Sequence, residues 1–182
     1  MVNLKQFYQQ SVVPALQREL GWSNVWQLPR LEKVVLNVGI SSSAKDAKFV
    51  DTAIATLRKV SGQQPVKTLA KQSISNFKIR QGQVVGLLVT LRGERMYHFL
   101  DKLIHVTLPR VRDFRGLDVK TIDDSGNLSI GLKENIAFPE VSPDEIERLH
   151  GVQVTVVSTA SNRRIGELLF RQLGFPFRRG VS

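Results

Sequence analysis

The apolar positions near the start of the chain follow the spacing of a helix and then that of a strand. Over residues 3–20 they recur every three or four positions, which predicts an amphipathic helix that ends at Gly21. Pro14 either kinks this helix or opens a second helical segment. Residues 31–40 (LEKVVLNVGI) alternate instead, which predicts a strand. Its apolar face would carry Val34, Leu36 and Val38, and its opposite face Lys33, Val35 and Asn37.

The remaining pattern predicts a mixture of helices and strands with short connections. Helices are expected at 45–60, ended by Ser61-Gly62, at 94–107 and at 162–173; strands are expected at 65–71, 84–92, 127–132 and 152–159; residues 108–126 are expected to be irregular, with Pro109, Gly116 and Gly126 as breakers. Strands joined by short connections pair antiparallel. We therefore expect an α+β fold, a mainly antiparallel sheet with helices packed on one face, and a single domain spanning 1–182.

Composition bounds the environment of the chain. The sequence contains no cysteine, which excludes disulfides, thiol catalysis and Cys-based metal centres and fits a reducing cytosol. Its first ten residues lack the apolar stretch of a signal peptide, and no apolar run approaches the ~20 residues of a membrane span. We expect a cytoplasmic protein without a membrane partner.

The positive charge of the chain is concentrated in its middle. The net charge is +10, and residues 58–112 hold eleven Lys and Arg against two acids, whereas residues 113–150 hold nine acids against four bases. No acid occurs between Asp51 and Glu94. A solvated surface usually mixes both signs. The acid-free span, which includes the stretch KQSISNFKIRQGQ at 71–83, therefore favours a surface that lies against phosphates.

Motifs of catalysis are missing from the sequence. No glycine-rich phosphate loop is present, and His98 and His105 have only Asp101 as a nearby acid, so we expect these two and His150 to be ordinary surface or half-buried histidines. The paired acids Asp123-Asp124 lie in DDSGN, where Asp and Asn favour a turn. The sequence predicts neither an enzyme nor a cofactor or metal site.

Uncharged polar residues offer a better candidate site. Asn37, Gln63 and Thr90 converge if their three segments are neighbours in one sheet, and Arg58, Lys67 and Arg92 would then surround them. Amides and hydroxyls suit bases and 2′-hydroxyl groups, and cations suit phosphates, so the set favours RNA. The alternative is that Asn37 and Thr90 only end their strands.

Several long motifs occur in the order and spacing of one known family. They are LEKVVLNVGI, SGQQPVKTLAKQSISNFKIRQGQVVGLLVTLRGERMYHFL, LPRVRDFRGL, GNLSIGLKENIAFPE and GFPF. Over residues 3–178 the chain resembles the bacterial family of ribosomal protein number five of the large subunit. That resemblance implies a non-enzymatic protein that attaches 5S ribosomal RNA to the central protuberance, beside large-subunit rRNA and neighbouring ribosomal proteins. It also implies a long protruding basic loop at 71–83.

The resemblance implies three contact sets. The 5S RNA surface would comprise Lys33, Asn37, Gln63, Lys67, Thr90 and Arg92. The loop would meet the peptidyl-site tRNA through Ser73, Asn76, Phe77, Lys78 and Arg80, with Phe77 alternatively packing at the loop base. An intersubunit bridge to the basic small-subunit head protein number thirteen would involve Arg110, Arg112, Asp113, Arg115, Glu134, Glu140 and Glu145.

The chain also departs from the family pattern. Arginines 163 and 164 open the last predicted helix where family members carry acids, against the preference of a helix N-terminus for negative charge. One hypothesis is that both bind an RNA phosphate. Two other functions compete with the ribosomal one: an RNA-modifying enzyme, which would need a catalytic cluster, and an unspecific nucleic-acid chaperone, which would not need the polar trio.

Overall fold

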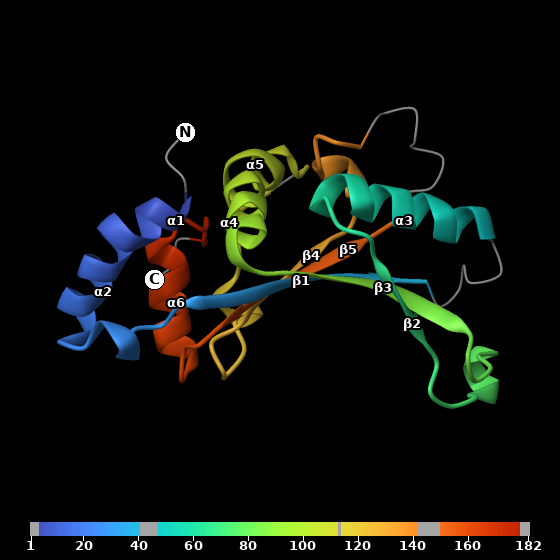
Figure 1. The fold of residues 1–182 in the computed structure, drawn as a ribbon, viewed down its shortest axis with the longest axis horizontal. Coiled ribbons are helices and arrows are strands. Elements are labelled where there is room, and N and C mark those ends of the chain that lie inside the picture. Colours follow the sequence, from blue (N-terminus) through green and yellow to red (C-terminus); the bar gives the residue numbers. More distant parts are fainter. Residues whose placement is uncertain (1–3, 41–46, 113, 142–149, 179–182) are drawn as a thin grey trace. The chain divides into compact units, whose positions relative to one another are not determined.

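The computed structural model describes residues 4–40, 47–112, 114–141 and 150–178. Helices and strands follow one another in the predicted order (Figure 1). The helices are α1 Leu4–Phe7, α2 Val13–Leu20, α3 Ala47–Ser61, α4 Gly93–Lys102, α5 Leu108–Arg110 and α6 Arg163–Gln172. The strands are β1 Leu31–Gly39, β2 Val66–Leu69, β3 Val84–Leu91, β4 Leu128–Leu132 and β5 Val152–Ser158.

Two prolines are accommodated inside helical segments by the same device. A π-helical turn, Tyr8–Val12, precedes Pro14, and a second, Leu103–Thr107, precedes Pro109. The wider turn matters because proline has no N–H and its ring would clash with the carbonyl four residues back in a regular helix. Pro14 thus opens a second segment, α2. The prediction of irregular chain from 108 onward was wrong for α5, because the second π-type turn lets the helix continue past Pro109.

The five strands form one sheet in the order β2-β3-β1-β5-β4. β2 and β3 pair antiparallel, with Val66 opposite Leu88 and Thr68 opposite Gly86. The Ile40 N–H, just after β1, donates to the carbonyl of Val85 at the start of β3, so this pair is antiparallel as well. The predicted α+β class with a mainly antiparallel sheet is confirmed.

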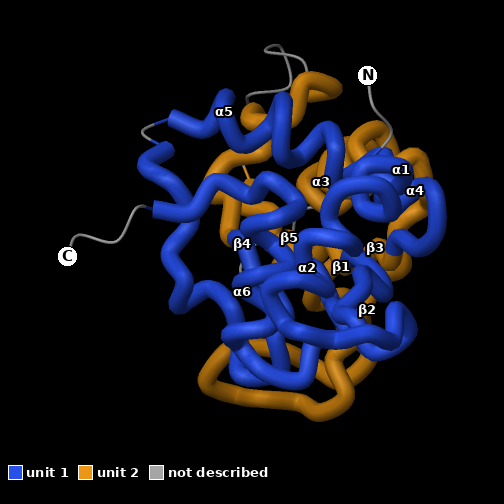
Figure 2. Tube along the Cα trace, turned by 90° about the vertical axis from the view of Figure 1, so that its left-hand side faces the viewer, with its two compact units in different colours: residues 1–34, 91–130, 155–182 blue, residues 35–90, 131–154 orange. Residues whose placement is uncertain are grey.

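The chain divides into two compact units, which Figure 2 distinguishes by colour. Unit 1 comprises residues 1–34, 91–130 and 155–182, and unit 2 comprises 35–90 and 131–154. The single domain of the sequence analysis stays a prediction. In unit 2, Ala53 and Leu57 of α3 are buried, and so are Leu36 and Val38 of β1.

Two glycines in unit 1 allow the 123–127 turn to touch the first turn of α6. A Cβ on Gly166 would lie 2.7 Å from both Cα and the carbonyl oxygen of Gly126. A Cβ on Gly126 would lie 2.6 Å from Cβ of Ala160. The Ser158 hydroxyl donates to the Gly126 carbonyl over 2.7 Å, which fixes the turn at this distance. Helix α6 and the end of β5 are therefore joined through a contact that tolerates no side chain.

We predict that Gly166→Ala lowers the free energy of unfolding by about 1–3 kcal/mol, because the added methyl would overlap backbone atoms that cannot rotate away. Chemical denaturation of the purified variant measures this loss. Gly131→Ala is the matched control, since a Cβ at Gly131 meets nothing within 4 Å. An equal, small effect of both substitutions would contradict the close contact.

Candidate nucleic-acid interface

The strands of unit 2 have one buried face and one partly exposed face. Leu36 and Val38 of β1 are buried, and so are Leu87 and Val89 of β3. The residues between them are half-buried, as strand alternation requires: Val35, Asn37, Leu88 and Thr90. We call this second side, together with Val66, Thr68 and Gly86, the open face. The alternation predicted for β1 is confirmed, and it brings Asn37 and Thr90 to the same face.

A glycine in the middle of β3 brings a further polar residue to the open face. A Cβ on Gly86 would lie 2.8 Å from Oγ1 of Thr68, 3.1 Å from the Val38 carbonyl and 3.9 Å from Oδ1 of Asn37. The Thr68 hydroxyl on β2 and the Asn37 amide on β1 therefore flank the same point of β3. Sequence reasoning missed Thr68. The signal that points to it is Gly86, because a glycine inside a strand often marks a close approach of another group.

Lys67 and Gln63, which the sequence predicts as part of the RNA surface, are not strand residues of the open face. Lys67 lies opposite Leu87 in the β2–β3 register, so its side chain leaves the sheet on the face of Leu87 and not on the open face. It is exposed on an edge strand of the sheet order, where a long side chain can reach round. Gln63 is half-buried in the turn after α3, and its N–H donates to the Ser61 hydroxyl over 3.2 Å. Their contacts with RNA stay predictions.

Two predicted phosphate partners in unit 1 share one acid. Lys33 Nζ and Arg92 Nη1 each lie 3.9 Å from Oε1 of Glu32. Both pairs are long and partly exposed, so each contributes well below about 1 kcal/mol. The acid nevertheless reduces the positive potential at this point. The sequence pattern shows no sign of it, because a count of charges by segment does not reveal which charges meet.

The 71–83 segment has hydrogen bonds of its own. Ala70 and Gln83 close its base, with the Ala70 N–H donating to the Gln83 carbonyl over 2.8 Å. Ile74 and Ile79 exchange two backbone hydrogen bonds, of 2.9 and 3.2 Å, around a short 3-10 turn, Ser75–Phe77. Lys78 follows in the left-handed region, with φ 53°. A non-glycine residue in that region is uncommon. Here Lys78 ends the 3-10 turn, and its N–H donates to the Ser75 carbonyl over 3.0 Å.

The loop side chains are turned toward solvent. Phe77 is 72% exposed, which argues against the alternative that it packs at the loop base. The Ser73 hydroxyl accepts the Gln81 N–H over 2.9 Å, so this serine also holds the loop in shape. Beside it lies an open hollow lined by Ser73, Ser75, Lys78, Ile79, Arg80 and Gln83. Asn76 is exposed at the turn. That the loop protrudes stays a prediction.

Comparison with known proteins identifies the family of this chain. Residues 24–80 match the description "Ribosomal protein L5", and residues 84–177 match the C-terminus of the same ribosomal family. The chain belongs to the ribosomal protein L5 family. A relative from Symbiobacterium thermophilum named "Large ribosomal subunit protein uL5" is 50% identical over 97% of this chain and 98% of its own length. Relatives of the same name from Natranaerobius thermophilus (50% identical, covering 97% and 99%) and Thermobifida fusca (48%, covering 96% and 92%) agree with it.

Proteins of this family are structural, non-enzymatic components of the ribosome, which in bacteria is cytoplasmic. Within the described residues, no group of three or more His, Cys, Asp or Glu could hold a metal ion. None of the helices in the described ranges is long and apolar enough to cross a membrane.

His98 and His105 are exposed, as expected, with His105 Nδ1 3.0 Å from Asp101 Oδ1. His150, expected at or near the surface, is instead buried, edge-on to Phe49 and 3.4 Å from Asn135 Nδ2.

The structure describes some of the predicted bridge residues but not all of them. Arg110, at the end of α5, and Arg112 and Arg115 are exposed in unit 1, whereas Glu134 is exposed and Glu140 half-buried in unit 2. Asp113 and Glu145 lie outside the described residues. The bridge set as a whole stays a prediction.

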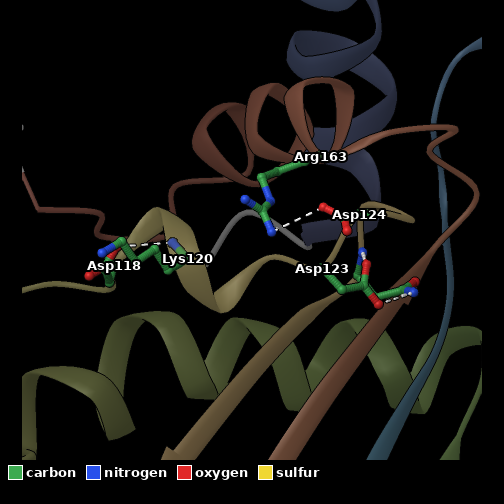
Figure 3. A network of polar contacts seen from close by, with 6 residues as sticks. Asp118, Lys120, Asp123, Asp124 and Arg163 are labelled. Carbon is green, nitrogen blue, oxygen red and sulfur yellow. Dashed lines mark hydrogen bonds and ion pairs between the residues drawn. The ribbon is translucent and has the colours of Figure 1, made fainter.

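The paired acids Asp123 and Asp124 form a turn, as the sequence indicates (Figure 3). The Asp123 carboxylate accepts the Asn127 N–H over 2.7 Å and the Asn127 side-chain amide over 2.8 Å. Asp124 pairs with Arg163 of α6 at 3.1 Å. This ion pair gives Arg163 a partner within the chain and accounts for a cation in the first turn of α6. Because Arg163 has this partner, the hypothesis that the two arginines bind RNA now rests mainly on Arg164, which is exposed.

We predict that Asp123→Asn lowers stability near neutral pH and that the difference from wild type shrinks as the solution is acidified. Burial raises the pKa of Asp123, but the Asn127 hydrogen bonds, the Ser125 N–H and the charge of Arg163 together bring it below its ordinary 3.8. A carboxylate with a lowered pKa stabilises the fold above its unfolded pKa, and this contribution is lost as pH falls through the folded value. Denaturation at several pH values between about 6 and 3 measures the difference.

Asp124→Asn is the control for this prediction, because its side chain is 96% exposed and has an ion pair instead of the two turn hydrogen bonds. An exposed pair of this kind contributes little. A stability difference for Asp123→Asn that is independent of pH would show that the carboxylate charge plays no part in the turn.

Proposed function

We propose that this protein, a constituent of the large ribosomal subunit like its family, binds 5S ribosomal RNA with the open face and attaches it to the central protuberance. The observation that carries the proposal is the arrangement around Gly86. A threonine hydroxyl and an asparagine amide flank a strand position without a side chain, so two polar groups gather where a larger residue would separate them. The groups that RNA would meet there are uncharged donors and acceptors.

The chemistry of these residues suits RNA recognition. Asn37, Thr68 and Thr90 offer hydrogen bonds to base edges or to the 2′-hydroxyl, which distinguishes RNA from DNA. Gln63 adds a further amide from the turn before β2. Val35 and Leu88, half-buried on the same face, exclude water and so strengthen the polar contacts beside them. We assign the phosphate contacts to Lys33, Lys67 and Arg92, which fix position without reading sequence.

The arrangement favours this function over the two alternatives. An unspecific chaperone would rely on charge, whereas the open face places uncharged polar groups at its centre. An RNA-modifying enzyme would require a group that transfers protons or activates a nucleophile, and the three central residues, Asn37, Thr68 and Thr90, do not supply one. Specific, structural binding is the function that these residues support best.

We predict that Asn37→Ala and Thr68→Val each lower the affinity for 5S RNA by about 3- to 10-fold, the effect of one hydrogen bond. The slope of log affinity against log salt should not change, because neither residue is charged. Arg92→Gln should instead reduce that slope by roughly 0.7–0.9. Binding titrations with a 5S RNA transcript at two or more salt concentrations, beside tRNA and an unrelated RNA, measure both quantities.

Two controls sharpen this experiment. Thr52→Val removes a hydroxyl that donates to the Lys48 carbonyl within α3, so it should leave RNA affinity unchanged. Glu32→Gln removes the acid shared by Lys33 and Arg92 and should raise the affinity. Equal and steeply salt-dependent binding of all three RNAs, unaffected by Asn37→Ala, would refute the specific 5S interface.

We further propose that the 71–83 loop contacts the peptidyl-site tRNA. The loop offers an exposed ring, Phe77, beside the cations Lys78 and Arg80. Aromatic rings stack on bases or ribose, and cations pair with the tRNA backbone. Its internal hydrogen bonds hold these groups in one arrangement before binding, which reduces the entropy lost on contact.

We predict that Phe77→Ala in assembled ribosomes weakens peptidyl-site tRNA binding about 5-fold or more, within the range found for loss of one stacking ring. Phe77→Tyr, which keeps the ring, should bind tRNA as wild type does. Filter binding of labelled tRNA to ribosomes carrying each variant gives the affinities. If Phe77→Ala ribosomes hold 5S RNA and bind tRNA normally, the loop has no such role, and the open-face proposal is unaffected.

We also propose that this protein forms an intersubunit bridge to small-subunit head protein number thirteen. What supports it is charge: Glu134 and Glu140 belong to the acidic stretch 113–150, and an acidic surface attracts a basic partner. Arg110, Arg112 and Arg115 are exposed and suited to RNA or acidic groups at the same bridge.

A further inference from the structure

Trp26 is the most exposed aromatic side chain among those whose exposure the structure describes, at 85%, and its neighbour Val25 is 51% exposed. A short 3-10 turn, Val25–Gln27, carries both. The side chain of Asn24 accepts the Trp26 N–H over 2.9 Å, so the backbone that presents the indole is held in place. Tryptophan is among the residues most enriched at binding hot spots, so an exposed indole with no role in the core is a candidate contact residue.

A hollow in unit 1 adjoins this turn. Two segments far apart in sequence form it, and two hydrogen bonds join them. The Arg30 N–H donates to the Thr159 hydroxyl over 3.0 Å, and the Thr159 N–H donates to the Arg30 carbonyl over 2.9 Å. The hollow mixes aromatic, amide and hydroxyl groups, since it is lined by Trp22, Gln27, Pro29, Thr159, Ala160, Ser161 and Ile165. Such a lining suits a planar polar ligand better than an apolar peptide.

The two segments that line the hollow carry charge of one sign. Residues 22–30 and 159–165 together contain three arginines and no acid. Arg163 is paired with Asp124. Burial raises the pKa of Tyr8 to about 12, and the nearby charge of Arg30 acts against this rise. Arg164 is exposed and directly precedes Ile165, which lines the hollow. An anionic ligand is therefore favoured at this surface.

We propose that Trp26 and the adjoining hollow form a second RNA contact of this protein, which takes an unpaired nucleotide. Its base stacks on the exposed indole, and its phosphates lie toward Arg164. Unpaired bases in RNA are the ones that proteins bind by stacking on aromatic rings, and stacking is largely independent of base identity. The site goes beyond the proposed 5S interface, because none of its residues is among those assigned to the open face or to its phosphate contacts.

Tryptophan fluorescence tests the proposal directly. The chain contains two tryptophans, so Trp22→Phe leaves Trp26 as the only indole and keeps an aromatic ring in the lining of the hollow. Titration of this variant with a single-stranded oligonucleotide and with a 5S RNA transcript should quench its emission, because a stacked base accepts an electron from the excited indole. Asn37→Ala added to this variant should leave quenching by the oligonucleotide unchanged, which separates the second contact from the open face.

Affinity provides the second readout. Trp26→Ala should weaken oligonucleotide binding about 5- to 100-fold without changing the salt slope, and Trp26→Phe should restore most of the loss because a ring is present again. Arg164→Gln should reduce the slope by roughly 0.7 for a single strand.

The outcomes separate this inference from the proposed function. Absence of quenching together with wild-type RNA affinity of Trp26→Ala would overturn the second contact and indicate that a protein covers the indole. Quenching by the oligonucleotide without specific 5S binding would support the second contact and refute the open-face proposal.

Discussion

The fold of unit 2 depends on the two-residue alternation of its central strands. Leu36 and Val38 on β1, with Leu87 and Val89 on β3, are removed from water on one side of the sheet, which is the main favourable term for these strands. Because successive side chains leave a strand on opposite sides, the same burial fixes Asn37 and Thr90 on the other side. A slip of one residue in either strand would exchange the faces and place an amide or a hydroxyl in the core.

Glycine has a related role at two places in the fold. At Gly86 the missing side chain lets Thr68 and Asn37 flank the strand, and at Gly166 it lets α6 touch the 123–127 turn. The first gap lies in the proposed interface, and the second joins packed elements within unit 1. At both positions the close approach of neighbouring atoms, and not backbone flexibility, explains the glycine.

The sequence predicted the elements well because each has a strong local signal, such as the three- and four-residue spacing in α3 and the glycine after it. It predicted that Asn37, Gln63 and Thr90 converge if their segments are neighbours in one sheet, and strand alternation places Asn37 and Thr90 on one face. It could not predict Thr68 or the face of Lys67, because both depend on the β2–β3 register, which tertiary packing decides. The ion pairs of Glu32 and Arg163 likewise join residues that local pattern does not connect.

The central claim is that the open face meets RNA while the opposite face remains packed against the core. NMR spectra of protein with labelled methyl groups, recorded with and without 5S RNA, test it most directly. Contact through the open face predicts shifts at Val35, Leu88 and Thr90, with Leu36, Leu87 and Val89 little changed. Shifts confined to the 71–83 loop and to exposed cations, with the open-face methyl groups unmoved, would contradict it.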